Sequence, residues 1–102
     1  MEILYLNKNN FDEAILNSDE KKLVVFYADW CPPCKALGVV LDKFDYDKDI
    51  TIAKVNIADN EELTERYNVY SVPTLLLFEN KKVIKSDTGF KSNESLKKFI
   101  EN

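Results

Sequence analysis

The segment Leu23–Ala28 is continuously apolar and rich in residues that favour strands. Because no polar residue alternates along it, the pattern predicts a strand that is buried on both faces. Thr74–Phe78 has the same character and predicts a second strand of this kind. Strands buried on both faces belong to sheets that helices cover on each side, so the chain is expected to have an α/β fold.

Shorter patterns place the remaining elements around these two strands. They predict further strands at Ile3–Leu6, Ile50–Ile57 and Val83–Ser86, and helices from Phe11 to near Asn17, over Ala36–Phe44, over Glu61–Tyr67, and after a cap at Ser92 or Asn93. The order β-α-β-α-β-α-β-β-α predicts a central mixed β-sheet flanked by helices on both faces. Only the polar turn Glu79–Lys82 separates the last two strands, so they are expected to form an antiparallel hairpin.

The length of 102 residues fits a single domain, residues 1–102, that can bury a core without disulfide staples. The net charge of -4 argues against nucleic acid as a partner, because an acidic surface repels phosphates. The longest apolar run is too short to span a bilayer, and Met1–Leu6 lacks the basic start of a signal peptide. We therefore expect a cytoplasmic protein with no membrane contact, and a monomer.

The chain has no histidine, which excludes catalytic pairs of serine or cysteine with histidine, and sites where histidine binds zinc or haem. Its two cysteines, Cys31 and Cys34, lie between a predicted buried strand and a predicted helix. Unpaired N–H groups and the helix dipole stabilise a thiolate at a helix N-terminus. We therefore expect Cys31 to be the reactive and more exposed thiol, and Cys34 to be the more buried one.

Cys34 follows one helical turn later, so it can attack a mixed disulfide formed on Cys31 and release the product. Pro32 and Pro33 fill the first turn of the helix, where missing N–H groups cost least, and they stiffen the ring that a disulfide closes. Since neither proline can donate to the Cys31 sulfur, only the amides of Cys34 and Lys35 can do so.

Three other interpretations of the cysteine pair stay open. A purely structural disulfide would close a loop too small to constrain the unfolded chain much. A zinc site would need two more ligands and would have to be shared across a dimer. Two inert core cysteines would fit poorly with the adjacent prolines and with the polar Asp29 and Lys35.

Val24–Lys35 resembles the active-site region of the thioredoxin family. Ala53–Ile57 is similar to the family's third strand, Tyr70–Phe78 to the segment that carries its cis-proline, and Thr88–Gly89 to the glycine after its hairpin. These segments follow the family's order and spacing over essentially the whole chain. The resemblance implies a thioredoxin fold and a thiol–disulfide oxidoreductase that reduces protein disulfides through a reversible dithiol.

By that resemblance, Cys31 is the nucleophile and Cys34 the resolving thiol of a redox-active disulfide. The implied supporting residues of the active site are Trp30, Pro32, Pro33, Lys54 and Pro73, with Pro73 as the cis-proline facing the disulfide. The implied substrate-binding surface consists of Trp30, Ile57, Ser71, Val72 and Gly89, although plain core packing also explains Ile57 and Val72. No bound cofactor or metal is implied. Electrons would come from NADPH through a flavin-dependent thioredoxin reductase, and the substrates would be disulfide-containing proteins.

Four positions depart from the family's pattern. Val25 stands where the family carries a buried Asp, thought to relay the proton of the resolving cysteine, and its side chain is expected in the core behind the cysteines. Pro32 replaces the usual glycine between the cysteines. Val39, next to Gly38, replaces a proline that kinks the helix, and Lys81 replaces a glycine in the hairpin turn.

Two alternative functions remain open at this point. A disulfide oxidase or isomerase would use the same dithiol in an oxidising compartment. A redox-inactive binding module would keep the fold with an incidental dithiol, but the joint presence of Trp30, Lys54, Pro73 and both cysteines argues against it.

Overall fold

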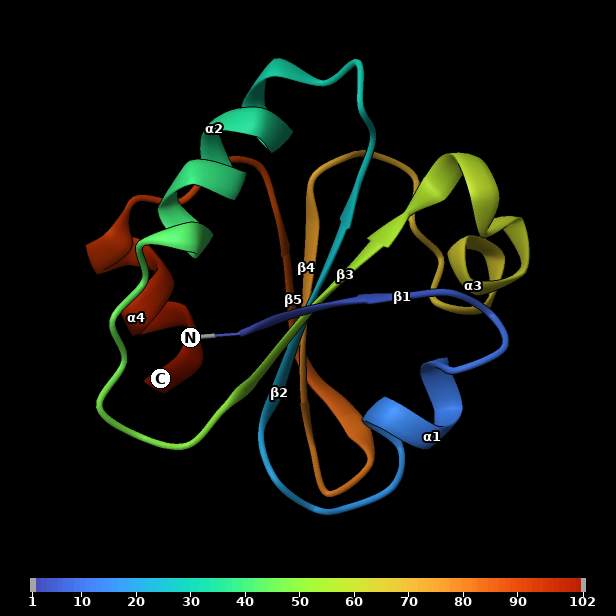
Figure 1. Cartoon of the computed structure of the whole chain (residues 1–102), viewed down its shortest axis with the longest axis horizontal. Helices are drawn as coiled ribbons and strands as arrows, with labels where there is room; N and C mark the ends of the chain where they lie inside the picture. Colours follow the sequence, from blue (N-terminus) through green and yellow to red (C-terminus); the bar gives the residue numbers. More distant parts are fainter. Residues whose placement is uncertain (1, 102) are drawn as a thin grey trace.

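The computed structural model describes residues 2–101, and Figure 1 shows a central sheet with helices on either side. The elements in chain order are β1 (Ile3–Leu6), α1 (Phe11–Ile15), β2 (Lys22–Tyr27), α2 (Pro32–Asp42), β3 (Thr51–Asn56), the 3₁₀ helix η1 (Ile57–Asp59), α3 (Glu61–Arg66), β4 (Thr74–Glu79), β5 (Lys82–Thr88) and α4 (Asn93–Glu101). Strands and α-helices follow the predicted order, and η1 is the one element that the sequence patterns missed.

The five strands form one mixed sheet in the order β1-β3-β2-β4-β5. β1 and β2 both run parallel to β3, whereas β4 is antiparallel to β2 and to β5. The predicted hairpin between β4 and β5 is confirmed. Its turn places Asn80 and Lys81 at φ 56° and 66°, the left-handed conformation that a two-residue hairpin loop needs at both central positions.

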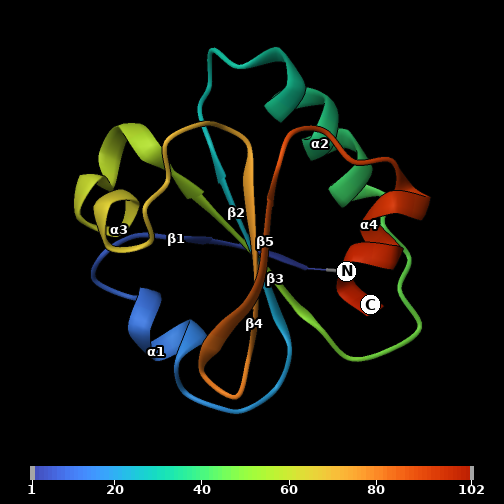
Figure 2. The same ribbon diagram turned by 180° about the vertical axis from the view of Figure 1, so that it is seen from behind.

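Alternation along the strands divides the apolar side chains between two cores. Val24 and Phe26 of β2 pack with α1 and α3, whereas Leu23 and Val25 pack with α2 and α4. Figures 1 and 2 show these two helix pairs on opposite sides of the sheet. Both faces of β2 are therefore inside the protein, which is why the sequence of this strand is apolar throughout.

The ends of several elements differ from the prediction, for local reasons. Ile57 belongs to η1 and not to the preceding strand, because the Asn56 side chain accepts the Ala58 N–H at 2.9 Å and turns the chain. Helix α2 begins at Pro32, before the predicted start at Ala36, and it ends at Asp42, two residues before the predicted end at Phe44. Phe44 nevertheless stays buried against the core that α2 and α4 share.

Candidate active site

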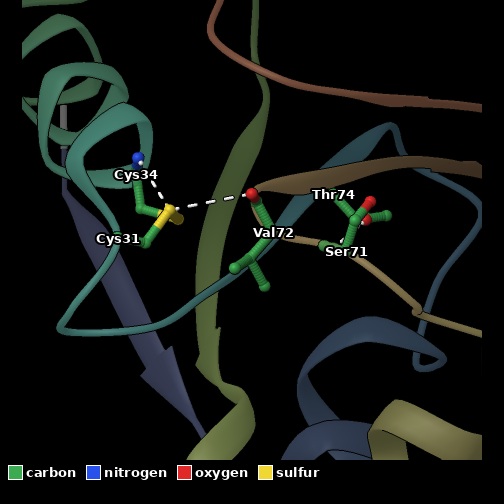
Figure 3. Close-up of a disulfide and its surroundings, with 5 residues drawn as sticks. All are labelled: Cys31, Cys34, Ser71, Val72 and Thr74. Atoms are coloured by element: carbon green, nitrogen blue, oxygen red, sulfur yellow. Dashed lines mark hydrogen bonds between the residues drawn. A yellow bond between two sulfur atoms is a disulfide. The ribbon is translucent and has the colours of Figure 1, made fainter.

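A disulfide joins Cys31 to Cys34 at the start of α2, directly beyond the carboxyl end of β2 (Figure 3). The two Cα atoms lie 5.2 Å apart, a usual separation for a disulfide. Both cysteines form a small buried cluster with Ala28. The site therefore holds a closed dithiol at a helix N-terminus, as the spacing predicted.

Cys31 is the N-cap residue of α2, with an extended backbone at φ -99° and ψ 107°. Its Sγ accepts the N–H of Cys34 at 3.2 Å, so one of the two predicted amide donors is confirmed. The N–H of Lys35 donates instead to the Cys31 carbonyl oxygen at 3.1 Å, which closes the first helical turn. Pro32 and Pro33 fill the first two helical positions, so the Cys34 amide and the helix dipole are the groups that favour a thiolate on Cys31.

The loop before β4 faces the disulfide, and its Val72–Pro73 peptide bond is cis, as predicted. The carbonyl oxygen of Val72 lies 3.6 Å from the Cys31 Sγ and points toward it in Figure 3. In the disulfide this sulfur carries no proton, but a Cys31 thiol would donate across the same gap. The loop is fixed from behind, because Thr74 Oγ1 donates to the Ser71 carbonyl at 2.6 Å and the Gly89 N–H donates to the Pro73 carbonyl at 2.9 Å.

Beside this loop lies an apolar groove of about 220 Å³, lined by Trp30, Ile57, Val69, Tyr70, Ser71 and Val72. Four of the five residues expected on the substrate surface thus come together, while Gly89 lies outside the groove and supports Pro73. Trp30 is 74% exposed and Tyr70 is 90% exposed, so two aromatic side chains stand on its rim. Sequence reasoning missed Val69 and Tyr70, although an aromatic residue three positions before the predicted cis-proline was a usable signal.

On the other side of the disulfide, a cleft of about 280 Å³ opens onto Cys34. It is lined by Tyr27, Ala28, Asp29, Cys34, Lys35, Gly38, Val39, Asp42 and Lys54. Val25 is a direct neighbour of Lys54 in the register of β2 and β3. Val25 is only 1% exposed and packs with Leu37 and Leu41 beneath α2, so its expected burial is confirmed.

Lys54 extends from β3 into this cleft between aromatic rings. Its Nζ lies 4.6 Å from the ring centroid of Tyr27 and 5.5 Å from that of Tyr5, within cation–π range. Within residues 2–101, Nζ has neither a carboxylate partner nor a hydrogen bond. Burial, followed by the nearby Asp29 carboxylate, raises the pKa of Tyr27, so its phenol stays protonated at neutral pH. Lys54 therefore forms no ion pair with the described residues, in a cleft whose lining also carries Lys35 and the carboxylates of Asp29 and Asp42.

The expected difference in exposure between the two cysteines is wrong for the oxidised protein. Cys31 is 2% exposed and Cys34 is 5% exposed, so both are buried and Cys31 is not the more exposed of the two. The Cys31 sulfur is covered by the loop that carries Val72, whereas Cys34 borders the open cleft. Exposure therefore does not distinguish the two cysteines, whereas the N-cap position belongs to Cys31 alone. No group of three or more Cys, Asp or Glu side chains within residues 2–101 is placed to hold a metal ion.

Residues 2–102 match the family model for thioredoxin. The chain belongs to the thioredoxin family. It is 39% identical to the thioredoxin of Buchnera aphidicola subsp. Acyrthosiphon pisum and 36% identical to that of Haemophilus influenzae, in each case over 97% of this chain and 94% of the relative. Among solved structures, it is similar to a mutant thioredoxin from Halobacterium salinarum NRC-1, with a TM-score of 0.88, 34% identity, and coverage of 98% of this chain and 88% of the other.

Membership of the thioredoxin family confirms the predicted fold and gives the cysteine pair its chemistry. The chain is a thiol–disulfide oxidoreductase, and its activity is the reduction of protein disulfides. The interpretations as a structural disulfide, a shared zinc site or an inert pair are thereby set aside. The thioredoxin fold places both cysteines between an apolar groove and a polar cleft, so the two sides of the disulfide differ in chemistry.

Proposed function

We propose that Cys31 is the nucleophile and Cys34 the resolving thiol of a reversible dithiol. The Cys31 thiolate attacks one sulfur of a substrate disulfide; that S–S bond breaks, and the other substrate sulfur leaves as a thiolate. Cys34 then gives up its proton and attacks the Cys31 sulfur, which releases the second substrate thiolate and forms the Cys31–Cys34 disulfide. Two electrons pass to the substrate. The N-cap position of Cys31, with the Cys34 amide at 3.2 Å, supports this assignment.

The substrate-binding surface in this proposal is the groove that contains Trp30, Ile57, Ser71 and Val72, enlarged by Val69 and Tyr70. Within residues 2–101, the N–H of Val72 donates to no other residue, and its carbonyl points toward Cys31. An extended polypeptide segment can pair with both of these backbone groups and bring its disulfide to the Cys31 sulfur. Gly89 contributes by holding the Pro73 carbonyl, and therefore shapes the surface from behind.

The remaining predicted residues support the dithiol. Pro32 and Pro33 hold the first turn of α2, the loop with Pro73 presents the Val72 carbonyl to the Cys31 sulfur, and Lys54 places a positive charge in the cleft that borders Cys34. A cation near Cys34 favours its thiolate, the form that attacks the mixed disulfide. We assign all of these to supporting roles, because none of them exchanges electrons with the substrate.

The cycle needs no bound cofactor, since the two sulfur atoms carry both electrons. We propose that a flavin-dependent thioredoxin reductase recharges the disulfide with electrons from NADPH, and that the protein works in the cytoplasm as a monomer. The net charge of -4 disfavours nucleic acid as a partner. Within residues 2–101, no helix is long and apolar enough to cross a membrane. The proposed domain, residues 1–102, includes two end residues that lie outside the described range.

The observation that carries the proposal is a disulfide at a helix N-terminus opposite a cis-proline loop, in a chain of the thioredoxin family. The test is reduction of insulin with NADPH and a thioredoxin reductase, with dithiothreitol as the alternative electron source. We expect catalysis with both sources, and about a tenfold lower kcat/KM for Trp30→Ala, which loses a large apolar anchor. Catalysis with dithiothreitol alone would contradict the proposed reductase, and an unaffected Trp30→Ala would contradict the proposed surface.

The reduction potential separates a reductase from the alternative of an oxidase or isomerase. Thioredoxins in general lie at about -270 mV, whereas disulfide isomerases lie at about -180 mV. Equilibration with glutathione buffers measures this potential directly. We expect a value on the thioredoxin side, and a potential at or above that of the isomerases would reverse the direction of the proposed reaction.

A further inference from the structure

A second groove lies next to the substrate groove on the same side of the molecule. It encloses about 440 Å³, and its lining includes Tyr70, Ser71, Leu76, Val83, Asp87 and several serine and threonine residues. These residues come from the loop after α3 and from the neighbouring strands β4 and β5. β5 is an edge strand whose residues are almost all exposed.

The two grooves are adjacent, because Tyr70 and Ser71 line both of them. Tyr70 stands between them as a ridge, and 90% of its surface is exposed. Ser71 directly precedes Val72, whose carbonyl faces the Cys31 sulfur. A polypeptide that lies across the first groove, with its disulfide at Cys31, therefore continues past Tyr70 into the second groove without leaving the surface.

The lining of the second groove combines two aliphatic side chains with uncharged polar groups. Leu76 is 3% exposed and Val83 is 39% exposed, while the walls carry hydroxyl groups of serine and threonine. Asp87 is the one charged residue in the lining, and Lys91 neutralises it at 2.6 Å. Lys85 of β5 turns away, since its Nζ donates to the Phe99 carbonyl in α4. Such a surface suits an apolar side chain and penalises an acidic one.

We propose that this second groove binds the substrate polypeptide at residues further from its cysteine, on one side of the disulfide only. The occupant is an extended segment that places an apolar side chain over Leu76 and Val83, with Tyr70 as the contact between the two grooves. Tyr70 and Val83 are then residues that determine specificity in the reduction reaction. This inference rests on the proposed substrate surface and extends it, because the first groove alone contacts only the residues beside the cysteine.

The test compares three synthetic peptides, each with one cysteine joined to glutathione by a disulfide. One peptide is short, and the other two carry an extension with a leucine, one toward the N-terminus and one toward the C-terminus. We expect one extended peptide to be reduced with about tenfold higher kcat/KM than the short one, the gain from partly burying one leucine side chain. Replacing that leucine by aspartate in the same peptide should remove the gain.

Matched variants on β5 locate the effect. Val83→Lys places a charge in the groove and should bring the ratio of extended to short kcat/KM close to one. Ile84→Lys is the control, because Ile84 is similarly exposed at 46% but lies outside the lining. Circular dichroism melting checks that both variants fold. An extended peptide with no advantage, an advantage that survives Val83→Lys, or an equal loss in Ile84→Lys would overturn the proposal.

Two further measurements distinguish failure of the second groove from failure of the proposed substrate surface and from dimer formation. Trp30→Ala tests the first groove, since it should lower kcat/KM for the short and extended peptides alike; an unchanged value there would contradict the proposed substrate surface and not the second groove. Sedimentation of the free protein tests a second copy of the chain as the occupant. If the protein is a dimer that Val83→Lys dissociates, the groove is a dimer interface and the proposal is overturned.

Discussion

The two sides of the Cys31–Cys34 disulfide offer its sulfur atoms different surroundings. On the substrate side, Cys31 faces the Val72 carbonyl next to an apolar groove with Trp30 on its rim. On the opposite side, Cys34 borders a cleft that contains the Lys54 ammonium. An apolar surface excludes water from the exchange of sulfur partners, whereas a polar cleft lets water reach the thiol that must lose a proton. In the proposed mechanism, one helical turn thus separates the step that selects substrate from the step that moves a proton.

The difference arises from where each residue stands in the fold. Cys31 is the N-cap and leaves the helix toward the cis-proline loop, whereas Cys34 lies inside the first turn of α2. β3 contributes Lys54 to the charged lining of the cleft, beside Val25 on the sheet face that α2 covers, and Asp29, Lys35 and Asp42 supply the other charges. Lys54 thus stands at the border of a layer that is otherwise filled by leucine, isoleucine and phenylalanine.

The largest expected effect comes from removing one sulfur on each side. Cys31→Ser should abolish disulfide reduction and trap no substrate, because the attacking atom is gone. Cys34→Ser should accumulate substrate on Cys31 as a mixed disulfide, because the resolving atom is gone. Non-reducing electrophoresis of each variant after incubation with an oxidised substrate measures the trapped species.

The burial of both cysteines makes a labelling experiment a sharp control for this prediction. Limiting iodoacetamide added to the reduced protein, followed by peptide mapping, shows which sulfur reacts first. We expect Cys31, whose thiolate the helix N-terminus favours. Faster labelling of Cys34 through the cleft, or equal trapping by the two serine variants, would reverse the assigned roles.

The second effect concerns the proton that Cys34 must lose. Val25→Asp would add a carboxylate below α2, in the layer behind Cys34, and should speed resolution of a Cys31 mixed disulfide by about tenfold to a hundredfold. General-base help is typically worth about 10²–10⁴ in rate, and water in the cleft already supplies part of it. The same change should lower the free energy of unfolding by about 1–3 kcal/mol, because it buries a polar group. Stopped-flow kinetics and urea unfolding of the oxidised protein measure the two effects.

Val24→Asp is the matched control for that experiment. Val24 is equally buried in the same strand, but it packs with α1 and α3, away from the cleft. We expect it to destabilise the protein at least as much without accelerating resolution. If both aspartate variants speed resolution equally, the rate gain reflects a loosened fold and the cleft is not the route of the proton.

The sequence predicted the surroundings of Cys31, on the groove side of the disulfide, better than the cleft beside Cys34. Two apolar runs and the helix start are local patterns that placed the cysteine pair, and the resemblance to the thioredoxin family identified Pro73 as the cis-proline of the facing loop. The cleft depends on Lys54 meeting Tyr27 and α2, which only the pairing of β2 with β3 brings together. The groove likewise gathers Tyr70 and Trp30 from segments far apart in the chain, and the position of Tyr70 three residues before Pro73 was the signal that could have marked it.

Replacing either glycine by alanine should have a smaller effect on the free energy of unfolding. The sign should differ between Gly38, on the cleft side of the disulfide, and Gly89, behind the cis-proline loop. Gly38 lies in α2 above the cleft, and an added Cβ would meet Lys54 Nζ at 3.5 Å, an ordinary contact. Gly38→Ala should therefore raise the free energy of unfolding by about 0.5–1 kcal/mol, the usual gain of alanine over glycine in a helix. Gly89, whose N–H donates to the Pro73 carbonyl, has a φ of +93°. Gly89→Ala should therefore lower the free energy of unfolding by about 1–2 kcal/mol.

Urea unfolding of the oxidised variants measures both changes. A Cβ at Gly89 would have no atom within 4 Å, so its cost comes from the backbone alone. Gly89→Asn is the control, because asparagine tolerates a positive φ better and should cost less than alanine. Equal losses for alanine and asparagine at this position would show that the backbone conformation is not the cause.

The smallest effect lies at the rim of the second groove, where Lys91 binds Asp87 at 2.6 Å. The Lys91 ammonium, followed by the Thr88 N–H, lowers the pKa of Asp87 below its ordinary value. Because the folded pKa is the lower one, the stability this pair contributes is present above the ordinary pKa of an aspartate and is lost as the pH falls through the folded pKa. Asp87 is half exposed, so Lys91→Met should cost only about 0.2–1 kcal/mol near neutral pH.

The pH dependence of the difference between Lys91→Met and the parent isolates this ion pair. Both proteins lose stability in acid through their other carboxylates, but that loss cancels in the difference. The parent's advantage should therefore shrink as Asp87 becomes protonated, while the contact of the Lys91 cation with the Phe99 ring, at 5.1 Å, contributes a part that does not change with pH. Lys98→Met removes a looser pair with Glu94, at 3.4 Å, and should change less. A Lys91→Met deficit that stays constant from neutral to acid pH would show that Asp87 carries no charge-dependent stability.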